Sequence, residues 1–328
     1  MDRRAFIGVL AASSALARRA LAQRTEKLPR VAVVFNSIPL AETAEHHFYR
    51  AFVDGLRDLG LVAGRNIIIE RRSAEGRRED MPGLMQELLA LHVDVIVSIG
   101  PGVGAAQRAT RSIPIVSVGT DGLVESGSAA SLGRPGGNLT GLTAEVGGVE
   151  MSTKRLQLLH EVAPRAARVA VLGYALRMEV NQVGLESAAR VLGRTIVWAH
   201  ARAPQELKPA LATIEKERAD ALYVEGTPTN YVHVREIVEF AAKLKLPSIY
   251  EFREGPEAGG LMSYGSNLAD LFRRAATFVD KILRGAKPGE LPMEQPTKFE
   301  LVINEKAAKA IGITIPQSLL LRADVVIQ

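Results

Sequence analysis

The sequence predicts an α/β fold of two Rossmann-like lobes, each built around a parallel sheet. Apolar, β-branched runs alternate with amphipathic helical stretches, and this alternation is typical of a doubly wound parallel sheet. Three of the strand-like runs also recur later in the same order. Residues 168–173, 219–226 and 246–252 repeat residues 30–34, 93–100 and 113–119, respectively. We therefore expect two lobes of one topology, with the carboxyl ends of their strands facing a shared cleft.

The first half of the chain alternates predicted strands and helices as far as residue 119. Phe48, Phe52 and Leu56 recur at helical spacing, and Gly60 ends this helix. The last strand of this half is followed by the carboxylate Asp121, at a place where open α/β sheets bind ligands. The predicted strands are residues 30–37, 66–71, 93–100 and 113–119, and the predicted helices are residues 44–60, 77–91 and 105–111.

A glycine-rich segment at residues 131–142 separates the two halves, because its four glycines and one proline exclude a helix or a buried strand. After the repeated strands, Leu271, Ala275 and Phe278 define the apolar face of a helix at residues 268–285. The remaining expectations are a connector at residues 287–298, a strand at 299–304, a helix at 305–311, and no assigned element at 316–326.

Residues 1–22 are expected to be a cleaved signal peptide and not part of the fold. Arg3 and Arg4 precede an apolar stretch at residues 5–17, which resembles a twin-arginine export signal and is too short to span a bilayer. A general-secretion signal is the alternative. The chain has no cysteine, which excludes disulfides, zinc thiolates and a lipid anchor on cysteine. We expect a freely diffusing periplasmic protein, with cleavage after Ala22.

The composition excludes further classes of function. The chain has 328 residues, of which 47% are hydrophobic and 23% charged, as in ordinary globular proteins. Its net charge of +5 is not gathered in a basic stripe, and only 5% of its residues are aromatic. A nucleic-acid interface is therefore not expected. No stretch after the signal peptide is long and apolar enough to form a transmembrane helix.

Three runs carry a resemblance to a known family: SLGRPGGNLTG at residues 131–141, EAGGLMSYG at 257–265 and EQPTKFELVIN at 294–304. They resemble the ABC transporter substrate-binding proteins of the tryptophan/tyrosine-binding-like group. The resemblance implies a type I periplasmic binding-protein fold, in which three crossovers join the two lobes. It also implies a first lobe of residues 29–141 and about 266–297, and a second lobe of residues 142–265 and about 298–328. The order of the elements after residue 300 is left open.

The same resemblance implies a function without catalysis. The protein would be the solute-binding component of an ABC importer. It would bind a small amino acid or a related organic acid in the interlobe cleft and deliver it to a permease in the inner membrane. No cofactor, metal or nucleic acid is implied, and we expect a monomer. A ligand-sensing module of a membrane receptor uses the same fold and is a further interpretation.

Candidate ligand-binding residues lie where the predicted strands end. In the first lobe they are Asn36, Ser37, Gly100, Pro101, Gly102, Thr120 and Asp121. The backbone N–H groups of the turn at residues 100–104 would bind a ligand carboxylate, because this turn opens a helix. Asp121 would pair with a ligand ammonium, or would instead cap the next helix or stabilise its turn.

In the second lobe the candidates are Tyr174, Gly226, Thr227, Asn230, Tyr250 and Phe252. Their aromatic rings would cover a flat or apolar face of the ligand. Two alternatives stay open for this group. Tyr250 and Phe252 would pack as buried residues between the lobes, and Asn230 would serve only as a helix cap.

A nucleotide-dependent enzyme is the principal alternative function. Residues 100–105, GPGVGA, fit the pattern G-x-G-x-x-A between a strand and a helix, with Asp121 about 20 residues later. This run follows the third strand instead of the first, however, and Pro101 stiffens the turn. Export would also separate the protein from cytosolic NAD. His46 and His47 have no partner at metal-ligand spacing and are expected to be a solvated pair.

Overall fold

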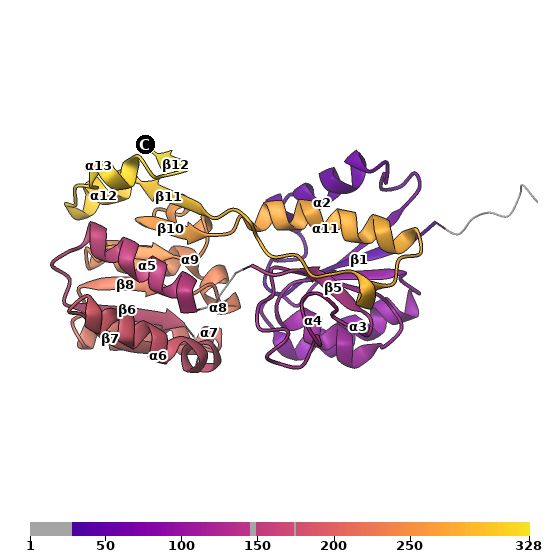
Figure 1. Ribbon diagram of the computed structural model, residues 1–328, viewed down its shortest axis with the longest axis horizontal. Coiled ribbons are helices and arrows are strands. Elements are labelled where there is room, and N and C mark those ends of the chain that lie inside the picture. Colours follow the sequence, from indigo (N-terminus) through magenta and orange to yellow (C-terminus); the bar gives the residue numbers. More distant parts are fainter. Residues whose placement is uncertain (1–27, 145–148, 174) are drawn as a thin grey trace, which may run out of the picture.

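The computed structural model describes residues 28–144, 149–173 and 175–328, which form two α/β lobes lying side by side (Figure 1). The first lobe contains a parallel sheet of strand order β2-β1-β3-β4-β5. Its strands are β1 (Arg30–Phe35), β2 (Ile68–Ser73), β3 (Val95–Ser98), β4 (Ile115–Val118) and β5 (Leu139–Leu142). Every residue of β3, β4 and β5 is buried, because helices cover both faces of the sheet. The expectation that residues 131–142 contain no buried strand and cross between the lobes is wrong for Leu139–Leu142, which form β5. Gly141 serves this strand, since its φ of 133° and its close approach to the Ser117 backbone leave no room for a side chain.

The second sheet has the order β12-β11-β10-β9-β8-β6-β7, and only the pairing of β10 with β11 is antiparallel. Its strands are β6 (Arg168–Gly173), β7 (Thr195–His200), β8 (Ala221–Val224), β9 (Ser248–Tyr250), β10 (Met262–Gly265), β11 (Glu300–Asn304) and β12 (Val325–Ile327). Strands β6 to β10 follow the order of β1 to β5 in the first sheet. The predicted fold of two similar parallel-sheet lobes is confirmed.

Helices follow the strands in both lobes. In the first half of the chain they are α2 (His47–Asp58), η1 (Arg78–Asp80), α3 (Met81–Ala90) and α4 (Pro101–Ala109). The later helices are α5 (Val149–Val162), α6 (Ala175–Val191), α7 (Pro204–Lys216), α8 (Pro228–Val232), α9 (Val234–Lys243), α10 (Glu254–Glu257), α11 (Leu268–Leu283), η2 (Pro288–Glu290), α12 (Glu305–Ile311) and α13 (Gln317–Leu320). No helix within these described residues has the length and apolarity to cross a membrane.

The end of the chain forms structure that the sequence did not predict. Residues 316–326, which received no element, contain α13 and the beginning of β12. Strand β12 pairs in parallel with β11 and forms an edge of the second sheet. Its three residues, Val325–Ile327, are too few to show an alternating pattern, and therefore sequence periodicity could not identify it.

Helix α11 belongs to the first lobe in space, although it follows the strands of the second lobe in the chain (Figure 1). Its Phe272 ring stacks on Phe48 at 5.1 Å and on Phe35 at 5.8 Å, measured between ring centroids. Helix α2 approaches α11 closely at Gly55, where an added Cβ would overlap the carbonyl oxygen of Arg273. A glycine at this position therefore allows the two helices to pack in contact.

Three segments pass between the lobes. The first joins β5 to α5 through residues 145–148, which lie outside the described residues; the second joins β10 to α11, and the third joins α11 to β11. The first and third are paired, because the Thr143 N–H donates to the Glu294 carbonyl at 3.0 Å. The Glu294 N–H in turn donates to Gly141 at 2.9 Å. The second and third are joined where Asn267 Nδ2 donates to Glu300 Oε1 at 3.1 Å.

The packing of α2 on α11 predicts opposite effects for two helical glycines. We expect Gly55→Ala to lower the free energy of unfolding by about 1–3 kcal/mol, because the added methyl group overfills the helix contact. Gly83→Ala in α3 is the matched control, since a Cβ there meets nothing within 4 Å. The control should be neutral or stabilising by up to about 1 kcal/mol. Urea denaturation measures both, and a stabilised Gly55→Ala would contradict the packing described.

Candidate ligand site at the strand ends

The carboxyl ends of β1, β3 and β4 carry the polar residues of the first lobe at one edge of its sheet. The side chain of Asn36 follows β1, and its Nδ2 donates to the carbonyl of Ile99 after β3 at 2.5 Å. The hydroxyl of Thr120 follows β4 and accepts from the Gly100 N–H at 2.7 Å. The structure therefore brings together the predicted residues from these three strand ends, and Ser37 lies beside them, half-buried.

The turn at residues 100–104 has fewer open donors than the sequence suggested. Helix α4 begins at Pro101, which has no N–H, and the N–H of Gly100 is bonded to Thr120. Gly102 packs so closely that an added Cβ would overlap Ser98 Oγ and lie 3.5 Å from Asn36 Oδ1. The side chain of Asn36 thus lies against the start of α4, where a pyrophosphate would have to approach in a dinucleotide-binding turn.

Asp121 has a backbone partner in the first crossover. Its Oδ1 accepts from the Ala144 N–H at 2.9 Å. This bond joins the end of β4 to the segment that leaves for the second lobe. The contact of Asp121 with a ligand ammonium stays a prediction.

The second lobe repeats the asparagine arrangement with a different residue. Asn230 Nδ2 donates to the Leu172 carbonyl at 3.0 Å and to the Glu225 carbonyl at 2.9 Å. Leu172 is the last residue but one of β6, and Glu225 directly follows β8. Strands β6 and β8 correspond to β1 and β3, which Asn36 joins in the first lobe. The cap of α8 is instead Thr227, whose Oγ1 accepts from the Asn230 N–H at 3.2 Å.

Both asparagines retain an acceptor without a partner. Asn36 is 8% exposed and Asn230 is 2% exposed. The Oδ1 atom of each has no hydrogen-bond partner within the described residues. A buried acceptor that stays unpaired costs about 1–3 kcal/mol. Each of these two oxygens retains the capacity to accept a hydrogen bond from a donor group.

The predicted aromatic residues have different surroundings. Tyr250 is buried in the core of the second lobe, where Gly255 and Gly260 leave space for its ring, and burial raises the pKa of its hydroxyl. Phe252 is half-buried and packs against the core of the first lobe. It also covers Gly226, whose N–H donates to Glu251 Oε2 at 2.6 Å. Tyr174 lies outside the described residues.

Sequence reasoning missed a set of buried charged residues near these strand ends. Arg155, Glu225 and Glu251 are each at most 2% exposed. Arg155 extends from α5 and donates through Nε to the Tyr264 carbonyl at 2.6 Å and through a guanidinium nitrogen to the Tyr223 hydroxyl at 3.2 Å. Charged residues are seldom fully buried without partners, and such clusters often lie at functional sites. No sequence pattern distinguishes Arg155 from a solvent-facing helical arginine.

The expectation of a solvated histidine pair is wrong for His46. Its ring is half-buried and its Nδ1 accepts from the Phe48 N–H at 3.3 Å, which caps α2. Burial, and secondly the neighbouring His47, lowers the pKa of His46 to about 4. His47 is exposed, as expected. Within the described residues, no group of three or more His, Cys, Asp or Glu side chains is arranged to hold a metal ion.

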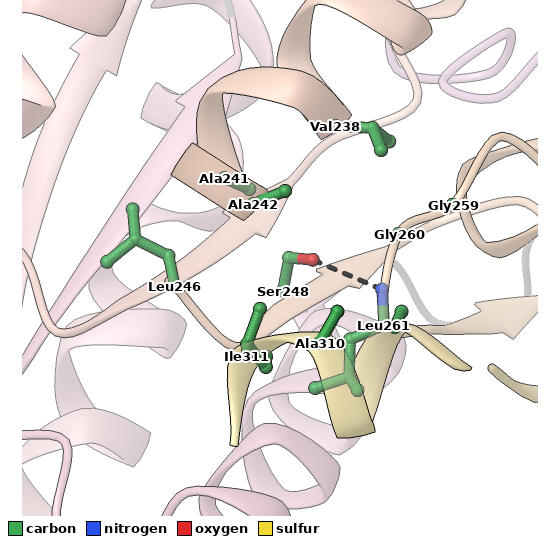
Figure 2. A pocket seen from close by; sticks show the side chains of 11 residues that line it. Val238, Ala241, Ala242, Leu246, Ser248, Gly259, Gly260, Leu261, Ala310 and Ile311 are labelled. Atoms are coloured by element: carbon green, nitrogen blue, oxygen red, sulfur yellow. Dashed lines mark hydrogen bonds between the residues drawn. The ribbon is translucent and has the colours of Figure 1, made fainter. Parts of the chain in front are cut away.

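A small apolar crevice lies at the amino ends of β9 and β10, whereas the candidate site lies at the carboxyl ends of the strands (Figure 2). Ser248 begins β9 there, and its Oγ accepts from the Leu261 N–H just before β10 at 3.3 Å. The crevice has a volume of about 40 Å³, whereas pockets for drug-sized ligands have about 300–1,000 Å³. It is therefore too small for an amino acid and is separate from the candidate site.

The hydrogen bond between Thr120 and Gly100 can be tested by substitution. We expect Thr120→Val to lower the free energy of unfolding by about 1–3 kcal/mol, because the Gly100 N–H loses its acceptor. Thr120→Ser keeps the hydroxyl and should cost clearly less. Thermal and urea unfolding of both variants measure the difference, and equal losses would show that the bond is not the cause.

The sequence model of the family described as ABC transporter substrate binding protein matches residues 31–327. The tyrosine-binding protein of Clostridioides difficile strain R20291 is 25% identical over 270 residues, which are 80% of this chain and 76% of that protein. A conserved domain protein of Vibrio cholerae O1 biovar El Tor has 26% identity and a TM-score of 0.82, over 92% of this chain and 100% of its own.

Two further solved structures differ in their state. An ABC domain from Streptococcus pneumoniae in complex with L-Trp has 22% identity and a TM-score of 0.82, over 92% of this chain and 100% of its own. A ligand-free, open substrate-binding protein from Clostridium difficile has 22% identity and a TM-score of 0.66, over 92% of this chain and 99% of its own. Because the family match spans nearly all of the sequence, this chain belongs to the ABC transporter substrate-binding proteins.

Proposed function

We propose that the protein is the exported solute receptor of an ABC importer, and that it delivers an amino acid or a related organic acid to a membrane permease. The observation that carries this proposal is the family match over residues 31–327 on a two-lobed fold. The ligand would lie between the polar strand ends of the two lobes. Its contacts with both lobes would favour the closed arrangement, which is the one a permease would recognise.

The chemistry of the strand ends supports a ligand that carries N–H donors. Asn36 and Asn230 each hold an unpartnered, buried carboxamide oxygen, one in each lobe. An ammonium group, an indole N–H or an amide would satisfy such acceptors. The relatives include a tyrosine-binding protein and a structure in complex with L-Trp, which supports an amino acid and makes aromatic amino acids the first to test.

The arrangement of the lobes is consistent with a closed receptor. Tyr231 and Phe252 of the second lobe pack against the core of the first. At equal identity and equal coverage of this chain, the TM-score is higher with the L-Trp complex than with the ligand-free, open structure. Rotation of one lobe against the other lowers the TM-score of a two-lobed chain, and therefore this difference supports closure.

The alternatives have less support. The relatives are substrate-binding proteins and not enzymes, and Asn36 lies against the turn that a dinucleotide would need. A periplasmic location and a monomeric state belong to the proposal. The predicted signal peptide at residues 1–22 lies outside the described residues.

The proposed ligand class can be tested by thermal shift and calorimetry. We expect L-tryptophan, L-tyrosine or a related acid to stabilise the purified protein, by about 2.7 kcal/mol when its concentration is 100 times Kd. NAD serves as the control ligand and should have no effect. Stabilisation by NAD, with none by amino or organic acids, would contradict the proposal and favour the enzyme.

The role of Asn36 can be separated from its contribution to folding. We expect Asn36→Ala to weaken the affinity for the ligand found in that screen by about 5- to 150-fold, equivalent to about 1–3 kcal/mol. Asn138→Ala is the matched control, since Asn138 is also buried in the first lobe and donates to the carbonyls of Thr110 and Ile113. Asn138 directly precedes β5, at the amino ends of the strands, whereas Asn36 lies at their carboxyl ends.

Both variants should lose unfolding free energy, and Asn138→Ala at least as much as Asn36→Ala, because Asn36 donates to one backbone carbonyl and Asn138 to two. Only Asn36→Ala should change the dissociation constant measured by calorimetry. Equal affinities in the wild type and Asn36→Ala would remove Asn36 from the ligand site.

A further inference from the structure

The two lobes touch directly beside the candidate site, at a set of residues that we call the interlobe patch. It consists of His46, His47 and Phe48 at the start of α2 in the first lobe, and Tyr231, Phe252 and Glu254 in the second. The second-lobe residues belong to α8, to the start of α10 and to the loop after β9. The patch therefore joins elements that are about 185 residues apart in sequence.

The apolar part of the patch carries side chains of one lobe into the core of the other. The Tyr231 ring lies 5.8 Å from the Phe48 ring, measured between centroids. Tyr231 and Phe252 both pack against the first-lobe core that contains Phe48 and Phe272. Separation of the lobes would expose these aromatic surfaces to water, which is unfavourable.

The polar groups of the patch are paired with one another, so the packing of the aromatic rings does not leave them without hydrogen-bond partners. Because His46 Nδ1 accepts from the Phe48 N–H, the neutral ring carries its proton on Nε2. This nitrogen lies 3.4 Å from the Tyr231 hydroxyl. Beside it, His47 Nε2 lies 3.2 Å from Glu254 Oε1. Both contacts join side chains of the two lobes directly.

We propose that Tyr231, supported by His46, is a positioning residue that draws the lobes together in the absence of ligand. A contact that is made only in the closed arrangement shifts the balance between open and closed states by its own free energy. When the unliganded protein is mainly open, the same contact tightens the apparent affinity for any ligand that the closed state holds. This consequence for affinity rests on the proposed receptor function, whereas the bias toward closure does not.

Distance measurements on the unliganded protein test the proposal directly. The chain has no cysteine, so Gln86→Cys in α3 and Lys208→Cys in α7 give one spin label in each lobe at exposed positions. Double electron–electron resonance then reports the distribution of distances between the lobes. We expect a population at the closed distance in the wild type, and its loss by at least fivefold in Tyr231→Ala.

Phe240→Ala is the matched control for the loss of an aromatic ring. Phe240 lies on α9 of the second lobe and is also half-buried, but it packs against the core of its own lobe. This variant should keep the wild-type distance distribution even if its melting temperature falls. Tyr231→Phe should reduce the closed population less than Tyr231→Ala, because it removes only the hydroxyl.

A pH series adds a readout that loss of packing would not produce. The titratable groups that face His46 are His47, next to it in the first lobe, and Tyr231 from the second lobe, which itself lies close to the charges of Glu254 and Glu257. Burial in the closed arrangement lowers the pKa of His46, so the closed state disfavours its protonation. The closed population should therefore fall as the pH drops from about 6.5 toward 4.

His46→Gln cannot titrate and should lose this dependence, whereas His47→Gln should keep it. The proposal is overturned if the unliganded wild type has no closed population, or if Tyr231→Ala has the wild-type distribution. Neither result depends on finding the ligand. Failure of the ligand screen, conversely, would leave these distance distributions unchanged, so the two proposals fail separately.

Discussion

The candidate site depends on one constraint, which is that neighbouring parallel strands end at the same edge of a sheet and must be held there. Each lobe meets it with a buried asparagine whose carboxamide N–H group binds strand-end carbonyls. Asn36 joins the ends of β1 and β3, and Asn230 joins the ends of β6 and β8. The two asparagines come from different places, a strand end and a helix, so the lobes share the solution although the residues are not equivalent in sequence.

The contact between the lobes depends also on helix α11, which packs on the first lobe although it follows the strands of the second in sequence. The helix completes the first core with Phe272 and lies against α2 at Gly55. Helix α2 also begins with the histidines and Phe48 that meet the second lobe. The same helix pair therefore stabilises the first lobe and positions the surface that touches the second. Packing far along the chain is in this way connected to the contact between the two lobes.

Local sequence was sufficient for the fold and for most of the strand ends, because β-branched runs such as β4 are followed immediately by Thr120 and Asp121. It was insufficient wherever a partner is distant in sequence. His46 is half-buried beside Tyr231, whereas Arg155 is fully buried against Tyr223 and Tyr264. None of these partners can be identified from spacing. Tyr250 shows a further limit, since a strand-end aromatic ring fits a lobe core as well as a cleft.

Glu294 holds the third connecting segment against the start of the first. Its carbonyl accepts from the Thr143 N–H and its N–H donates to the Gly141 carbonyl, which makes one parallel bridge beside the end of β5. The second connecting segment is joined to the third through the side chains of Asn267 and Glu300. Sliding the third segment along the other two would break these hydrogen bonds, so the connections between the lobes are cross-linked and not independent of one another.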